Sequence, residues 1–264
     1  MKNVDFVAQM ELFLEALFKD ATARNNAIVF NYNPNYPRYL SFEAHKLIGA
    51  IKNLSRYYLK EVTNSKLSII FNIVNYSLTS VHFDIYIKCT TVPLKQNKKL
   101  INEADVLLSE LNAHINQIVD GFCININIPL PKSGTFKKRN SKISNLSGKN
   151  AIIACEDKDI FSIISHELSF HGLKLNKQKS FESLNLHIKD AIFKPDIIFV
   201  QKEYLSDKAR LDEMLTYQKL KNFYIVIISK DEAKSIKSEK MITLRQPFTS
   251  DSLHETLGIV ARNL

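Results

Sequence analysis

Residues 194–201 read Lys-Pro-Asp-Ile-Ile-Phe-Val-Gln, and this stretch decides the fold of the second half of the chain. Large apolar residues fill it from Ile197 to Val200, and a polar residue, Gln201, ends it. A run that is apolar on both faces predicts a central strand of a parallel sheet with helices on each side. Ligands and chemistry in such sheets lie beyond the carboxyl ends of the strands. Gln201 occupies that position, although an amide is neither an acid, a base nor a phosphoryl acceptor.

Strand and helix patterns alternate on both sides of this stretch. We expect strands at 151–155, 173–175, 197–200, 224–228 and 241–244. The helices expected between and after them span 160–170, 180–188, 206–220, 231–238 and 250–263. Because parallel strands need right-handed crossovers, residues 150–264 are predicted to form an α/β domain with a five-stranded, doubly wound parallel sheet.

The first half of the chain has a different pattern. Amphipathic helices are expected at 5–22, 41–59 (with Ser41 as its N-cap) and 104–119, and strands at 27–32, 66–74, 82–89 and 122–128. The last two strands alternate apolar and polar residues, which indicates an antiparallel sheet with one solvated face. Residues 1–132 are therefore predicted to form an α+β sandwich with helices on one face of a mixed sheet.

The segment 133–149 is expected to be a linker between the two domains. It is polar and lacks acidic residues, and with Lys132 it forms a basic run within a chain of net charge +9. Such a run is typical of a solvated linker, and the alternative is a phosphate-binding or nucleic-acid-binding segment.

Cysteine and histidine usage predicts no metal site. The three cysteines are widely spaced in apolar surroundings, as expected of buried, reduced thiols. His166 and His171 are expected on different faces of one helix. The amino terminus lacks the apolar core of a signal peptide, and no apolar run is long enough to cross a membrane, so we expect a cytoplasmic location.

Four motifs in residues 150–264 resemble the receiver domain of two-component response regulators. They are Ala-Ile-Ile-Ala-Cys-Glu-Asp (151–157), Lys-Pro-Asp-Ile-Ile-Phe-Val-Gln (194–201), Tyr-Ile-Val-Ile-Ile-Ser (224–229) and Leu-Arg-Gln-Pro-Phe (244–248). The resemblance implies an acidic metal-binding pair at Cys155/Glu156 or Glu156/Asp157, both registers remaining open. It implies a phospho-accepting aspartate at position 201, a hydroxyl at Ser229 and a charge-sensing lysine at position 246.

Two of these reactive positions have changed. Gln201 replaces the aspartate and Gln246 replaces the lysine, so the family's acyl phosphate cannot form and its charge sensor is lost. We expect a receiver that is inert to phosphotransfer and that folds without Mg²⁺.

Residues 5–130 resemble the ATP-binding domain of histidine kinases in the order of their elements. The resemblance rests on 4–14, on Tyr-Pro-Arg-Tyr-Leu (36–40), on the helix containing 46–54, and on Ile-Asn-Ile-Pro-Leu-Pro (126–131). Tyr57 falls near the family's metal-binding asparagine, and Asn53 matches a neighbouring, structural asparagine. The strand ending at Cys89 should lead into an Asp-x-Gly-x-Gly box but continues Thr-Thr-Val-Pro. Family-type ATP binding is therefore not expected.

These resemblances together suggest a degenerate fragment of a hybrid histidine kinase. The leading hypothesis is a non-catalytic adaptor without cofactor or metal, which binds a two-component kinase, receiver or phosphotransfer protein, or a second copy of itself. The first alternative is a divergent ATP-dependent kinase or phosphotransferase. The second is nucleic-acid binding through the basic run.

Overall fold

A computed structural model describes residues 2–93, 97–132, 142–230 and 240–264. The chain divides into two compact units, Met1–Arg139 and Asn140–Leu264. Each unit is described by itself below.

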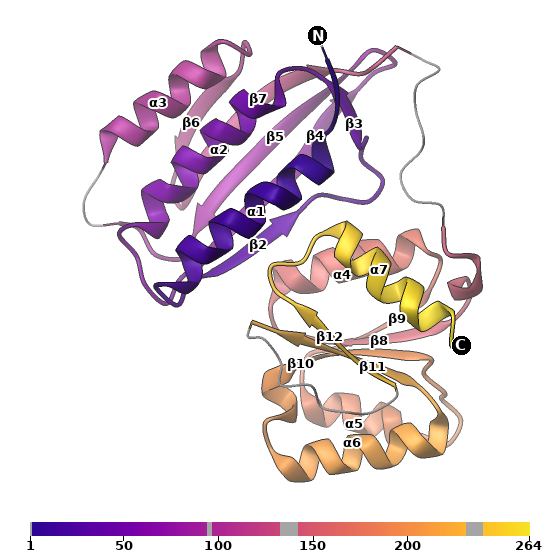
Figure 1. Ribbon diagram of the computed structural model, residues 1–264. Helices are drawn as coiled ribbons and strands as arrows, with labels where there is room; N and C mark the ends of the chain where they lie inside the picture. The colour runs from indigo at the N-terminus through magenta and orange to yellow at the C-terminus, as the bar shows by residue number, and fades with distance from the viewer. Residues whose placement is uncertain (1, 94–96, 133–141, 231–239) are drawn as a thin grey trace. The chain divides into compact units, whose positions relative to one another are not determined.

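The second unit contains a five-stranded, fully parallel sheet (Figure 1). Its strand order is β12-β11-β10-β8-β9. The strands are β8 (Asn150–Ala154), β9 (Lys174–Gln178), β10 (Ile197–Gln201), β11 (Tyr224–Ser229) and β12 (Met241–Arg245). Helices α4 (Lys158–Phe170) and α7 (Ser250–Ala261) cover one face, and α5 (Phe181–Lys189) and α6 (Lys208–Lys221) cover the other. The predicted doubly wound fold is confirmed; the helix expected at 231–238 lies outside the described residues.

The apolar strands occupy the centre of this sheet, as their sequences predict. Residues Ile197 to Val200 of β10 are all fully buried between neighbours β8 and β11. Asp196 fixes the start of β10, because its Oδ2 accepts a hydrogen bond from the backbone N–H of Asn150 at the start of β8 (2.7 Å). The Pro-Asp that precedes the apolar run thus aligns the two strands that carry the candidate pocket.

The first unit is an α+β sandwich. Its main sheet has the order β2-β4-β5-β7-β6, in which only the β2–β4 pair is parallel. The strands are β2 (Ala27–Asn31), β4 (Lys66–Tyr76), β5 (Ser80–Cys89), β6 (His114–Ile118) and β7 (Gly121–Pro129). Helices α1 (Phe6–Thr22), α2 (Ala44–Leu59) and α3 (Lys98–Ser109) lie on one face, which confirms the predicted class (Figure 1).

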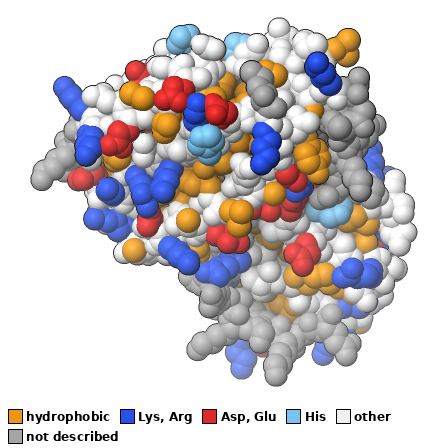
Figure 2. Space-filling model, turned by 45° about the horizontal axis from the view of Figure 1, so that its top comes forward, with side chains coloured by type: hydrophobic (Ala, Val, Ile, Leu, Met, Phe, Trp, Pro, Cys, Tyr) orange, Lys and Arg blue, Asp and Glu red, His pale blue; other side chains and the backbone are white. Residues whose placement is uncertain are grey.

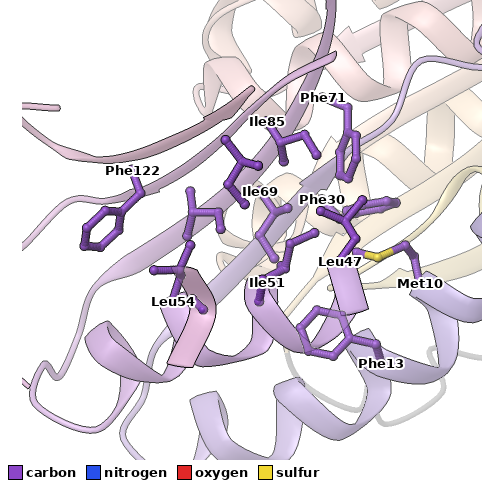
Figure 3. Close-up of a cluster of buried hydrophobic side chains, with 14 of the residues drawn as sticks. Met10, Phe13, Phe30, Leu47, Ile51, Leu54, Ile69, Phe71, Ile85 and Phe122 are labelled. Atoms are coloured by element: carbon purple, nitrogen blue, oxygen red, sulfur yellow. The ribbon is translucent and has the colours of Figure 1, made fainter. Parts of the chain in front are cut away.

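The core of this unit lies between the helices and that face of the sheet. Figure 3 shows side chains from α1 and α2 pointing toward those of the strands; the labelled residues are Met10, Phe13, Phe30, Leu47, Ile51, Leu54, Ile69, Phe71, Ile85 and Phe122. Phe71 lies at the centre of an aromatic group, with its ring centroid 5.5 Å from that of Phe6 and 5.3 Å from that of Tyr32. These apolar contacts account for the stability of a sheet that is covered on only one side.

Several predicted boundaries in this unit are wrong. The helix expected at 104–119 runs instead over Lys98–Ser109, and its expected end is the edge strand β6. Asn112 ends the helical region with a left-handed backbone (φ 53°), a conformation that Asn tolerates. Ser41 is not the cap of α2 but the last residue of β3 (Tyr39–Ser41), which pairs with β1 (Asn3–Asp5).

The open face of the main sheet carries a polar ladder across three strands. Asn116 Nδ2 of β6 donates to Asn125 Oδ1 of β7 (2.6 Å), and Asn125 Nδ2 donates to Asp84 Oδ1 of β5 (2.6 Å). These side chains alternate with buried residues along each strand, as the sequence pattern predicts.

The expected linker 133–149 is only partly described. Residues 133–141 lie outside the described residues, and 142–149 pack within the second unit. Leu146, in a short 3₁₀ helix (Ser144–Leu146), is fully buried, and the backbone N–H of Ile143 donates to His171 Nδ1 (3.1 Å). The expectation of a linker extending to residue 149 is therefore corrected, because the apolar Leu146 anchors the segment.

Candidate functional site

Gln201 ends β10 at the carboxyl edge of the parallel sheet. Its side-chain Oε1 accepts a hydrogen bond from the backbone N–H of Glu156, which follows β8 (2.9 Å). The amide thus joins the end of one central strand to the loop after the next. At the position where a receiver would present a nucleophile, this side chain is held by a backbone contact.

Tyr204 adds a second connection that the sequence reasoning missed. Its hydroxyl lies 2.7 Å from the carbonyl oxygen of Lys179 and 3.1 Å from Glu156 Oε1, within hydrogen-bond distance of both acceptors. Burial, followed by the bond to Glu156, raises the pKa of the Tyr204 phenol well above its usual value. Glu156 is therefore restrained through both its backbone and its carboxylate.

The other two residues of the expected acidic pair have structural contacts. Asp157 is the N-cap of α4, and its Oδ1 accepts from the backbone N–H groups of Asp159 (3.0 Å) and Ile160 (3.3 Å). Cys155 is buried, and burial raises the pKa of its thiol to about 12. An un-ionised thiol and a capping carboxylate make a poor set of ligands for Mg²⁺, which prefers octahedral oxygen coordination.

Ser229 and Gln246 lie next to each other at the ends of β11 and β12. The backbone N–H of Gln246 donates to the Ser229 carbonyl oxygen (2.8 Å), and both residues are buried. Among the described residues, no donor lies within hydrogen-bond distance of Gln246 Oε1. A neutral amide thus occupies the position where the receiver resemblance implies a lysine ammonium.

In the first unit, Tyr57 belongs to the core. It is only 3% exposed, and its ring makes edge contacts with Tyr58 (centroids 5.0 Å apart) and Phe122 (5.4 Å). Burial raises the pKa of its hydroxyl. A buried aromatic ring at this point of α2 cannot replace the metal-binding amide that the kinase resemblance implies.

Asn53 and Cys89 do not assemble a nucleotide site with it. Asn53 Nδ2 contacts Glu103 Oε2 of α3 (3.5 Å), and Cys89 is buried with a pKa raised by desolvation. After Cys89, the Thr90 hydroxyl accepts from the backbone N–H of Lys66 (2.9 Å). The segment in place of the glycine-rich box is therefore attached to β4 by side-chain as well as backbone bonds.

A surface pocket of this unit lies at the carboxyl ends of α1 and α2. It is lined by Lys19, Asp20, Ala23, Arg24, Arg56, Leu59 and Lys60. Arg56 pairs with Asp20 (Nη2–Oδ2 3.1 Å). Cations at helix carboxyl ends offset the negative end of the helix dipole, which explains this group structurally.

Comparisons with known proteins give structural matches only. No protein-family model matches the chain, and no curated protein matches its sequence. The crystal structure of full-length ShkA, a hybrid histidine kinase, in complex with AMPPNP aligns with 98% of this chain and 57% of that chain, with a TM-score of 0.70 and 11% identity. This chain thus spans little more than half the length of that kinase.

Shorter matches cover one half of the chain each. A response regulator receiver protein from Sinorhizobium medicae WSM419 covers 44% of this chain and 97% of its own (TM-score 0.39, 17% identity). The catalytic domain of the histidine kinase ThkA covers 48% and 95%, respectively (TM-score 0.37, 12% identity). None of the described helices has both the length and the apolar composition needed to cross a bilayer. The chain therefore has the kinase-like and receiver-like folds of two-component signalling proteins.

Proposed function

We propose that this chain is a non-catalytic regulator of two-component signalling that acts by binding other proteins. The observation that carries the proposal is Gln201 at the carboxyl end of β10, with its amide oxygen bonded to the Glu156 N–H. A carboxamide cannot attack phosphorus to form an acyl phosphate, so the receiver fold remains without its transfer chemistry.

The kinase-like unit supports the same proposal. Tyr57 is buried in the core, and the segment after Cys89 is attached to β4, so the two positions that should hold metal and adenine serve the fold. Loss of both activities while both folds are retained favours a role in binding. A two-component kinase, receiver or phosphotransfer protein is the expected partner, and self-association is a further possibility within the proposal.

Phosphorylation chemistry provides the direct test. The full chain is incubated with acetyl phosphate and Mg²⁺, or with Mg-ATP, and its intact mass is measured before and after acid or hydroxylamine treatment. We expect no phosphoryl adduct and no thermal shift with Mg-ATP. An acid-stable, hydroxylamine-sensitive adduct on the wild-type chain would refute the proposal and favour a divergent phosphotransferase. The double variant Q201D/Q246K, which restores the two lost groups, is the matched comparison.

Partner capture tests the binding role. The full chain and residues 150–264 are used separately as bait in lysate of the source organism. Specific recovery of two-component proteins is expected, and their consistent absence from both captures would count against this class of partner. Gel filtration with light scattering measures self-association, and a monomer at high concentration would remove that part of the proposal.

The described surface does not favour nucleic-acid binding. Lys137, Lys138 and Arg139 of the basic run lie outside the described residues. On the face drawn in Figure 2, Lys and Arg side chains gather toward one side, and Asp and Glu lie among them. Mixed charges of this kind differ from the continuous basic stripe of a nucleic-acid-binding face. Salt-sensitive retention on DNA, abolished by changing those three residues to Ala, would reverse this ranking.

A further inference from the structure

Glu167, His171 and His254 meet between helices α4 and α7 of the second unit. Glu167 and His171 are four residues apart at the carboxyl end of α4 and so project from one helix face. His254 comes from α7, which packs beside α4 on the same face of the sheet (Figure 1). Glu167 is 3% and His171 1% exposed, whereas His254 is partly exposed.

The three side chains present their ligand atoms at short separations. His254 Nδ1 lies 3.4 Å from His171 Nε2, which lies 3.5 Å from Glu167 Oε1, and all three atoms are within 4.8 Å of one another. A tetrahedral zinc ion with bonds of about 2.0–2.1 Å holds its ligand atoms about 3.3–3.4 Å apart. Two of the three separations therefore already match those around a zinc ion.

We propose that Glu167, His171 and His254 form a Zn²⁺ site that joins the first and last helices of the receiver-like unit. Two imidazole nitrogens and one carboxylate oxygen suit Zn²⁺ and other late first-row divalent ions, whereas Mg²⁺ prefers oxygen ligands alone. The partial exposure of His254 leaves a path for the ion and for a water molecule as the fourth ligand. The site is separate from the receiver pocket around Gln201.

The surroundings of Glu167 fit this role. The Ser250 hydroxyl donates to Glu167 Oε2, which orients the carboxylate and leaves Oε1 directed at the histidines. A hydrogen bond to the second oxygen of a ligating carboxylate is a common supporting contact in metal sites. Ser250 is itself buried in the first turn of α7, so the same helix supplies both a ligand and its support.

The Ile143 contact makes the proposal specific. The backbone N–H of Ile143 donates to His171 Nδ1 (3.1 Å), which places the proton of neutral His171 on Nε2. Zinc at Nε2 requires that proton to move to Nδ1, where it would face the Ile143 N–H. Metal binding must therefore break this bond, at a cost comparable to the 10- to 100-fold affinity loss seen when supporting contacts of ligands are removed. Zinc loading should thus expose the Ile143 amide.

The alternative arrangement is a metal-free hydrogen-bond network. In it, His171 Nε2–H donates to Glu167 or His254, and the Ile143 bond is kept. The two arrangements predict opposite changes at Ile143 when zinc is added. They also predict different consequences of removing His254, which would abolish zinc binding in the first arrangement and leave the protein equally insensitive to zinc in the second.

The test uses the full chain after EDTA treatment. Titration with ZnCl₂ is followed by calorimetry and thermal shift, with MgCl₂ as the comparison ion, and amide exchange is followed at Ile143. We expect one Zn²⁺ per chain, stabilisation by Zn²⁺ but not Mg²⁺, and faster exchange at Ile143. His254→Ala should weaken zinc binding at least 100-fold, and the exposed His114→Ala of the other unit should leave it unchanged. Circular dichroism of the metal-free variants checks that each is folded.

Cobalt gives an independent readout. Co²⁺ at a tetrahedral site with two nitrogens and one carboxylate absorbs visible light, and this absorption should be lost in His254→Ala and Glu167→Gln. The proposal is overturned if zinc neither binds nor stabilises the wild-type chain. It is equally overturned if folded His254→Ala retains wild-type zinc affinity, because the ion would then be bound elsewhere.

Discussion

The bond between Gln201 Oε1 and the Glu156 N–H leads to a prediction at a single amide. Changing Gln201 to Ala removes the acceptor that lies 2.9 Å from this nitrogen. A neutral hydrogen bond contributes about 1 kcal/mol net, and Glu156 is exposed, so water partly replaces the lost acceptor. Because about 1 kcal/mol corresponds to a factor of about five, the Glu156 amide should exchange with solvent about fivefold faster in Gln201→Ala.

Residue-resolved hydrogen exchange on the full chain measures this effect. Gln201→Glu is the matched control, because its carboxylate oxygen has the same reach and still accepts from the Glu156 N–H. Amides of β4 in the other unit report any global change. Exchange at Glu156 that is the same in Gln201→Ala and the wild type would refute the assignment of Gln201 as a structural link.

The same control variant also tests the inert pocket. A carboxylate at position 201 beside Glu156 adds an oxygen ligand and negative charge, both of which attract Mg²⁺. Stabilisation by Mg²⁺ is therefore expected for Gln201→Glu and not for the wild type. A large stabilisation of the wild-type chain by Mg²⁺ would contradict the reading of the pocket.

Three further substitutions or titrations test the structure. Tyr57→Ala should destabilise the first unit by about 3–5 kcal/mol, as expected when a buried aromatic ring is removed, measured by urea unfolding against Tyr57→Phe, which should cost much less. Asp157→Ala should destabilise the second unit by about 1 kcal/mol through loss of the α4 cap, whereas Asp157→Asn retains an acceptor and should cost less. Since burial raises the pKa of Cys155 to about 12 while the unfolded thiol ionises near pH 9, its contribution to stability is present below pH 9 and lost as pH rises toward 12. Urea unfolding between pH 8 and 11 should show that fall, and Cys155→Ser should reduce the slope; an equal slope in the variant would contradict it.

Much of the fold could be predicted from local patterns. The fully apolar strand Ile197–Gln201 is recognisable because a strand buried on both faces needs no polar alternation. The edge strand His114–Ile118 could not be recognised in the same way. Its isoleucines Ile115 and Ile118 continue the apolar spacing of the preceding helix, and Asn112 was the only local signal of a break.

The candidate sites were less predictable because they depend on distant partners. Gln201 could be placed at the strand end, but its bond to Glu156 depends on the tertiary pairing of β8 with β10. His171 was taken as unpaired, since its neighbour His166 lies on another face of α4. Its contact is instead His254, which is distant in sequence and arrives only when α7 packs against α4.

The ladder of Asn116, Asn125 and Asp84 has a consequence for how the strands choose their alignment during folding. Alternation of apolar and polar residues rejects a slip of one residue, which would turn every side chain to the opposite face. A slip of two residues preserves the alternation and would go undetected by apolar burial alone. The three side chains of the ladder meet only in the native pairing of Asp84 with Asn125, so a two-residue slip would separate them. On a face that contributes little to the core, these polar groups discriminate between otherwise equivalent pairings.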